Sequence, residues 1–162
     1  MKSYNVAKFG MFVALAFLLS YIESLFPIPI PVPGIKIGLA NLVVICGLYT
    51  MGVKEAFVLS IIRIILVGFT FGNPSTMLFS MAGGILSWAC MTLLSKVKSF
   101  SVIGVSVVGG IAHNVGQIMV AALVVNNIAL VFYLPILLIS GVITGAIIGF
   151  LGAIIVNTIK KT

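Results

Sequence analysis

One short stretch of the sequence, GGIAHNVGQI at residues 109–118, places three polar side chains in an otherwise apolar run. His113 and Gln117 are four residues apart, so they share a face if the stretch is helical, and Asn114 lies beside them. Imidazole and amide groups donate and accept hydrogen bonds without carrying charge, which suits the orientation of a ring or an amide in a ligand. Because His113 is the single histidine, a bond to a neighbouring helix is an equally open interpretation.

Other polar residues also interrupt apolar runs, and each costs free energy in a membrane unless it is paired or faces a cavity. At about 1.5 Å per helical residue, Arg63, Asn41 and His113 would lie about 12 to 17 Å from the cytoplasmic ends of their spans, near the middle of a bilayer. We therefore predict a substrate-binding site in the outer half of the protein. Its expected residues are Glu23, Lys36, Asn41, Arg63, Asn73, His113, Asn114 and Gln117.

Each of these residues also has a purely structural interpretation. Arg63 and Glu23 could form an ion pair that orients two helices rather than binding a ligand. Asn73, within GNPS, is typical of a turn residue. A single histidine and no acidic cluster argue against a metal site. We expect neither catalytic residues nor an intrinsic cofactor.

The composition indicates whether the chain folds in water or in a lipid bilayer. Of 162 residues, 62% are hydrophobic and only 7% are charged, and the mean hydropathy is +1.37. A globular protein of this size could not bury so much apolar surface, so the sequence predicts an integral membrane protein. The net charge of +7 does not indicate nucleic-acid binding, because the cations are not clustered on one solvated face.

The apolar runs predict an all-α membrane protein, a single domain over residues 1–162 with six transmembrane helices. The alternating polar positions of a membrane β-barrel are absent. The second span is short, at about 22 Å against a hydrocarbon core of about 30 Å. The six predicted spans are Val6 to Phe26, Ile37 to Met51, Ala56 to Phe71, Thr76 to Leu94, Val102 to Val125 and Ile128 to Val156.

The connections between the spans predict the orientation of the chain and one external loop. With six spans, Lys54, Lys98 and Lys161 fall on the same side as most other lysines, so the positive-inside rule places both termini in the cytoplasm of a bacterial cell. On the other side, the segment at 27–37 carries four prolines that forbid a regular helix. We expect this segment to be an extracytoplasmic loop that acts as a lid.

Small residues at four-residue spacing predict close contacts between helices. Gly141, Gly145 and Gly149 form such a ridge along the last span, and packing inside the bundle is the favoured interpretation. Gly10 and Ala14 form a similar pair on the first span. We predict that this pair docks a partner membrane protein, and internal packing is the alternative.

Long motifs in the chain resemble the family of Gx transporters, also labelled heptaprenyl diphosphate synthase component I. The resemblance runs from about Pro31 onward. It implies similarity to the S components of energy-coupling factor (ECF) transporters, which have six helices, cytoplasmic termini and a small vitamin-like ligand in the outer half. The motifs that carry it are PGIKIGLANLV (33–43), FGNPSTMLFSMAGGILS (71–87), GVSVVGGIAHNVGQI (104–118) and LPILLISGVITGAIIG (134–149).

The two labels of this family imply different chemistry. Prenyl synthases hold Mg²⁺ with aspartate-rich motifs, whereas this chain contains no aspartate and only two glutamates, Glu23 and Glu55, on opposite sides of the predicted bilayer. We therefore expect that it is not the enzyme. It also lacks a GxxxxGK[ST] loop, so ATP would be used by partner subunits.

The resemblance favours a substrate-binding subunit for uptake of a small vitamin-like, isoprenoid or quinone-related molecule. Its expected partners are an ECF-type coupling membrane subunit, a pair of ATPases and the lipid bilayer. The alternatives are a non-catalytic membrane partner of a prenyl diphosphate or quinone biosynthetic enzyme, and a solitary carrier. The residues do not identify the substrate.

Overall fold

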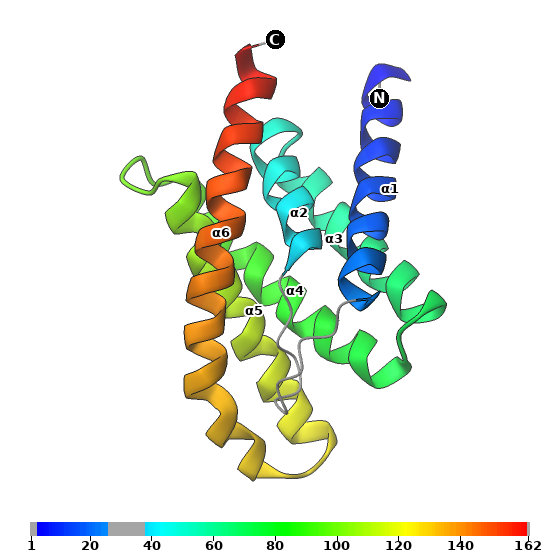
Figure 1. The fold of residues 1–162 in the computed structure, drawn as a ribbon, viewed down its shortest axis with the longest axis vertical. Coiled ribbons are helices and arrows are strands. Elements are labelled where there is room, and N and C mark those ends of the chain that lie inside the picture. Colours follow the sequence, from blue (N-terminus) through cyan, green and yellow to red (C-terminus); the bar gives the residue numbers. More distant parts are fainter. Residues whose placement is uncertain (1–2, 26–37, 162) are drawn as a thin grey trace.

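The computed structural model describes residues 3–25 and 38–161, and this part of the chain is helical with no strand. Consecutive helices run in alternating directions up and down the molecule, with α3 and α4 inclined to the long axis (Figure 1). A short 3-10 helix, η1, precedes the last of them. The elements are α1 Ser3–Leu25, α2 Leu39–Thr50, α3 Val53–Thr70, α4 Pro74–Ser95, α5 Val102–Val124, η1 Ile128–Tyr133 and α6 Leu134–Lys161.

Four segments are long and apolar enough to cross a membrane: Val6–Leu25 in α1, then α4, α5, and η1 together with α6. Large hydrophobic side chains are exposed along these helices, as expected of a surface that faces lipid. The chain is thus a membrane protein by the length and composition of its helices. The predicted shortness of the second helix is confirmed, since α2 has only 12 residues, about 18 Å of rise.

The last predicted span, Ile128 to Val156, begins with a 3-10 helix rather than a regular α-helix. Residues 128–133 form η1, which Asn127 caps by accepting a hydrogen bond from the Ala129 amide, 3.0 Å away. The α-helix then begins at Leu134, and Pro135 occupies its first turn, where the missing amide hydrogen is not needed. The polar cap and the proline together explain why the regular α-helix starts only after η1.

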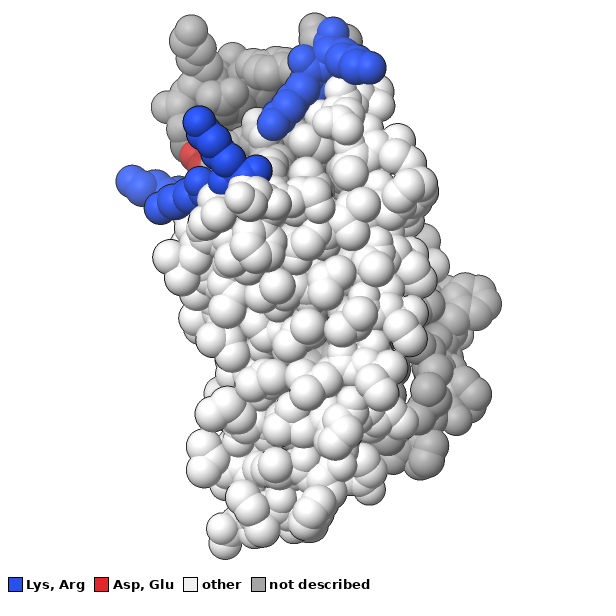
Figure 2. Space-filling view, turned by 90° about the vertical axis from the view of Figure 1, so that its left-hand side faces the viewer, with Lys and Arg blue, Asp and Glu red and all other residues white. Residues whose placement is uncertain are grey.

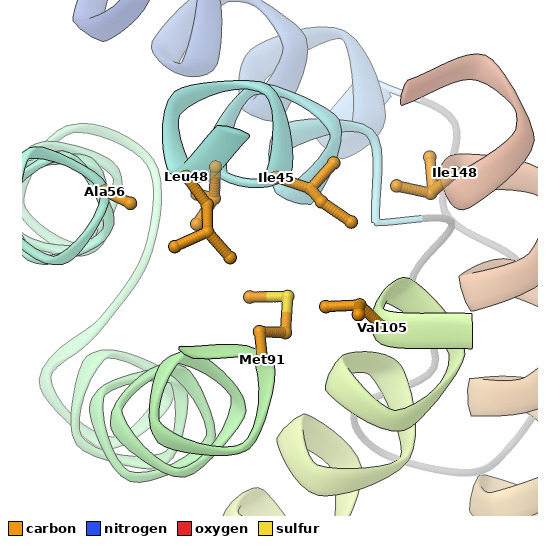
Figure 3. Close-up of a cluster of buried hydrophobic side chains, with 7 residues drawn as sticks. Ile45, Leu48, Ala56, Met91, Val105 and Ile148 are labelled. Carbon is orange, nitrogen blue, oxygen red and sulfur yellow. The ribbon is translucent and has the colours of Figure 1, made fainter. Parts of the chain in front are cut away.

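Helix α2 lies in the middle of the bundle, in contact with α1, α3 and α6. Seven of its 12 residues are buried, including Ile45 and Leu48. These two side chains point toward Met91 of α4 and Val105 of α5 in a cluster of buried hydrophobic residues (Figure 3). The short helix is therefore surrounded by protein rather than lipid over much of its surface.

The glycine ridge on α6 packs inside the bundle, as favoured from the sequence. A Cβ atom built on Gly145 would lie 2.7 Å from Val107 Cα, and one on Gly149 would lie 2.7 Å from Ile103 Cα. These backbone atoms cannot yield as a flexible side chain could, so α5 and α6 approach closely only because the ridge lacks side chains. Gly10 on α1 differs, because a Cβ there would meet nothing within 4 Å.

The two ends of the molecule along its long axis differ in charge. The N-terminal end of α1 and the C-terminal end of α6 lie at the same end of the long axis (Figure 1). The Lys and Arg side chains on the face in Figure 2 gather at that end, and the rest of the described surface on this face carries none. On this face the charge asymmetry expected from the sequence is present.

Candidate functional site

A pocket between the helices gathers polar residues from all six α-helices or their ends. We call it the polar pocket; its empty volume is about 490 Å³, including its open mouth. It contains six of the eight predicted substrate-binding residues, contributed by α1, α2, α3 and α5. The lining residues are Glu23, Gly38, Asn41, Arg63, Ser80, Gly110, His113, Asn114, Gln117 and Thr144.

Glu23 connects the last turn of α1 to the start of α2. Its Oε1 atom accepts a hydrogen bond from the backbone amide of Gly38, with a distance of 2.5 Å between the two atoms. Gly38 has a φ of +81°, a left-handed conformation that favours glycine. This contact fixes the two chain ends that enter and leave the segment 26–37. It also engages the Glu23 carboxylate with a partner other than Arg63.

Arg63 lies about halfway along α3, and its guanidinium group has unused hydrogen-bonding capacity. Nη2 donates to Asn41 Oδ1 at 3.5 Å, a long and therefore weak hydrogen bond. Nε is buried and has no hydrogen-bond partner. The charge of Glu23 acts on Arg63 electrostatically, and both side chains line the polar pocket. A buried donor without an acceptor costs about 1 to 3 kcal/mol, and more when it is charged.

Helix α5 presents three polar residues to the pocket. His113 and Gln117 lie one turn apart against Gly83 of α4, where a Cβ would come within 3.2 Å of His113 Cε1 and 2.8 Å of Gln117 Cγ. Gly83 thus makes room for both side chains. Asn114 is nine-tenths buried, and its Nδ2 donates to the carbonyl oxygen of Leu137 on α6 at 2.7 Å. Asn114 therefore ties two helices together while it lines the pocket.

Of the other two predicted binding residues, one lies elsewhere and the other is outside the described part of the chain. Asn73 is the N-cap of α4, where its side chain accepts from the Thr76 amide at 2.8 Å, and it is not among the lining residues. Lys36 lies outside the described residues, as does the loop at 27–37 that we expected to act as a lid. The proposed docking residues, Gly10 and Ala14, are both exposed on α1.

Four lining residues were missed from the sequence: the glycines Gly38 and Gly110, and two hydroxyl residues, Ser80 and Thr144. Thr144 stands directly before Gly145, so its position beside the glycine ridge was an available signal. Its Oγ1 donates to Ser140 O at 2.9 Å, within its own helix. Ser80 lies three residues before Gly83, on the same helical face. In both cases a small hydroxyl residue near a close helix contact faces the pocket.

The chemistry of the residues that line the polar pocket favours the binding of a ligand. Among the residues that the structure describes, no group of three or more His, Cys, Asp or Glu side chains could hold a metal ion. The pocket instead combines one cation, one anion and several neutral donors and acceptors. Such a set can orient a small molecule with both polar and apolar parts.

A family model described as heptaprenyl diphosphate synthase component I matches residues 12–155 of the chain. No curated protein and no solved structure matches it. The matched stretch contains every residue that lines the polar pocket, whereas Gly10 lies just outside it.

Proposed function

The chain belongs to the heptaprenyl diphosphate synthase component I family, and we propose that it is a substrate-binding membrane subunit that takes up a small molecule. The observation that carries this proposal is Arg63, whose buried Nε lacks an acceptor within a pocket lined from all six α-helices. An oxygen of a bound ligand would satisfy this donor. Binding would thereby recover the free energy that the unpaired group costs.

The charges of the pocket indicate the class of ligand. Arg63 keeps its charge at any physiological pH, and its fork of donors matches carboxylate or phosphate oxygens. Glu23, the opposing charge, already accepts from Gly38. His113 and Gln117 add groups that can orient a ring or an amide. We infer a ligand with an acidic group attached to a less polar body, such as a vitamin-like, isoprenoid or quinone-related molecule.

The direction of uptake follows from the charge asymmetry. In membrane proteins, the side rich in lysine and arginine faces the cytoplasm. The lysine-rich end in Figure 2 and both termini would therefore lie in the cytoplasm. Multiple helices would span the cell membrane. The polar pocket lies at the start of α2 and the end of α1, toward the opposite end. The ligand would thus be captured from outside.

A binding subunit of this kind needs an external source of energy. The chain carries no phosphate-binding loop of the GxxxxGK[ST] type. We infer an ECF-type coupling membrane subunit with a pair of ATPases that use ATP. The exposed residues Gly10 and Ala14 on α1 offer a small-residue surface on which another membrane helix could approach closely.

The family description supports a second candidate function. A heptaprenyl diphosphate synthase component would be a non-catalytic membrane partner of a prenyl-transferring enzyme. The absence of aspartate in the sequence argues that the chain does not itself hold the magnesium ions of that reaction. In this case the polar pocket would bind a diphosphate or quinone intermediate.

Affinity purification of the full chain from its native membrane, in a mild detergent, separates the two candidates. Recovery of a coupling membrane subunit and two ATPases is the expected result. Recovery of a soluble prenyl synthase would instead favour the second function. Purification with neither partner, from membranes shown to contain both, would contradict both assignments.

A further inference from the structure

A second cavity adjoins the polar pocket. Four residues line both cavities, namely Gly38, Asn41, Gly110 and Thr144. We call this second cavity the lower chamber. Its remaining lining residues are Ile45, Ser87, Met91, Ser106, Gly109, Gly145 and Ile148.

Two serines that line this chamber are buried residues. Ser87 on α4 is 6% exposed and Ser106 on α5 is 5% exposed. Within the described part of the chain, neither hydroxyl has a hydrogen-bond partner. Hydroxyls in other helices, such as those of Ser20 on α1 and Thr50 on α2, donate to the carbonyl four residues earlier. The two chamber serines therefore hold donor and acceptor capacity that the protein leaves free.

The polar groups of α4 and α5 are arranged in two tiers. Ser80 and His113 line the polar pocket, whereas Ser87 and Ser106 line the lower chamber. In each helix the two residues are seven positions apart, which is two turns on one face and about 10 Å along the axis. A ligand that contacts both tiers must therefore be elongated.

The floor of the chamber is apolar. Ile45, Met91 and Ile148 line the chamber and belong to the cluster of buried hydrophobic residues in Figure 3. Gly109 lies beside this floor, since a Cβ there would come within 2.6 Å of Met91 Sδ and 3.3 Å of Ser87 Oγ. The lower chamber contains no charged residue among its described lining. It suits a slender neutral group that carries an oxygen atom.

We propose that the lower chamber is a second subsite for the distal end of the ligand, where Ser87 and Ser106 bind a neutral hydroxyl or carbonyl oxygen. This inference rests on the proposed function, because the acidic end of the same ligand lies at Arg63. The ligand is thus an elongated molecule with an acidic group at one end. About 10 Å away, it carries a neutral oxygen on an apolar body.

Two probe molecules that differ only in the distal oxygen test this assignment. Octanoate and ω-hydroxyoctanoate are measured by equilibrium dialysis against the full chain in lipid nanodiscs, with empty nanodiscs as the blank. We expect ω-hydroxyoctanoate to bind about 2- to 10-fold more tightly, the gain of a neutral hydrogen bond. The double variant Ser87→Ala with Ser106→Ala should reduce this ratio to about one.

Ser60→Ala serves as the matched control. Ser60 is a buried serine on α3 that lines neither the polar pocket nor the lower chamber, so its variant should keep the wild-type ratio. Equal binding of the two acids to the wild type would overturn the second subsite. The same conclusion follows if the ratio survives in the double variant, or if neither acid binds.

Arg63→Gln separates this inference from the proposed function. It should weaken both acids by the same factor and leave their ratio unchanged, because the distal oxygen is bound elsewhere. If both affinities stay at wild-type values in Arg63→Gln, the role of Arg63 in the proposed function fails. The ratio of the two acids still decides whether the lower chamber binds the distal oxygen.

Discussion

Glu23 at the end of α1 and Gly38 at the start of α2 are joined by a hydrogen bond of 2.5 Å from the Gly38 amide to the Glu23 carboxylate. The contact spans fifteen positions in the sequence. It holds the entrance of the polar pocket, to which both residues contribute. The same carboxylate acts electrostatically on Arg63 and also positions the backbone.

Glu23→Ala should destabilise the protein by removing this contact. A hydrogen bond to a charged group contributes about 1.5 to 3 kcal/mol, and Glu23 is only partly buried, so we expect a loss near the lower end of that range. Thermal unfolding in nanodiscs measures the change. Glu23→Gln keeps an amide oxygen as acceptor and should recover part of the loss. Equal stability of Glu23→Ala and the wild type would contradict the structural role.

Arg63→Gln should weaken ligand binding far more than Gln117→Ala. Loss of a buried charged partner costs about 2 to 5 kcal/mol, whereas loss of a neutral hydrogen bond costs about 0.5 to 1.5 kcal/mol. Lys36→Ala should fall between them. Affinities are compared by equilibrium dialysis with octanoate as the acidic probe. If Gln117→Ala weakened binding more than Arg63→Gln, Arg63 would instead be interpreted as an ion-pair partner of Glu23.

Leucine substitutions on two helices should separate internal packing from partner docking. Gly145→Leu pushes a side chain into the backbone of α5 at Val107, so we expect loss of the folded protein in detergent, seen by size-exclusion chromatography. Gly10→Leu with Ala14→Leu changes two exposed residues, and a side chain at Gly10 meets open space, so the double variant should fold normally while the complex with the coupling subunit is lost. A double variant that still assembles and transports would show that this surface docks no partner.

Single cysteines should report the orientation of the helices. Residues Lys54, Lys98 and Lys161, replaced by cysteine one at a time, are expected to react with a membrane-impermeant thiol reagent only from the cytoplasm. Asn73→Cys, at the other end of α3 and α4, is expected to react only from outside. Labelling of positions 73 and 98 from the same side is incompatible with the six-span arrangement.

The pattern of apolar and polar residues predicted much of this site, and the reason is physical. Each polar group within a membrane span must face a cavity or a partner, so the sequence alone assigns Glu23, Arg63 and His113 to one region, and all three line the polar pocket. Spacing along α5 similarly placed Gln117 on the face of His113. These predictions depend only on residue type and on spacing within one helix, both of which can be read from the sequence.

Contacts between helices were harder to predict from the sequence. The bond from Asn114 to Leu137 and the bond between Glu23 and Gly38 depend on which helices are neighbours. Serine and threonine are compatible with lipid-facing, packed and cavity-lining positions alike, so Ser87 gave no distinguishing signal. The 3-10 helix before α6 was missed because its residues are as apolar as those of the helix that follows.

Native mass spectrometry of the gently extracted protein tests the central claim most directly, that the polar pocket binds a small acidic molecule through Arg63. The wild type should retain a bound molecule whose mass and fragments reveal a carboxylate or phosphate group, and Arg63→Gln should lose it. Thr158→Val, a change near the end of α6 and away from the pocket, should retain it. A bound molecule that is cationic, or one that Arg63→Gln retains fully, would contradict the account.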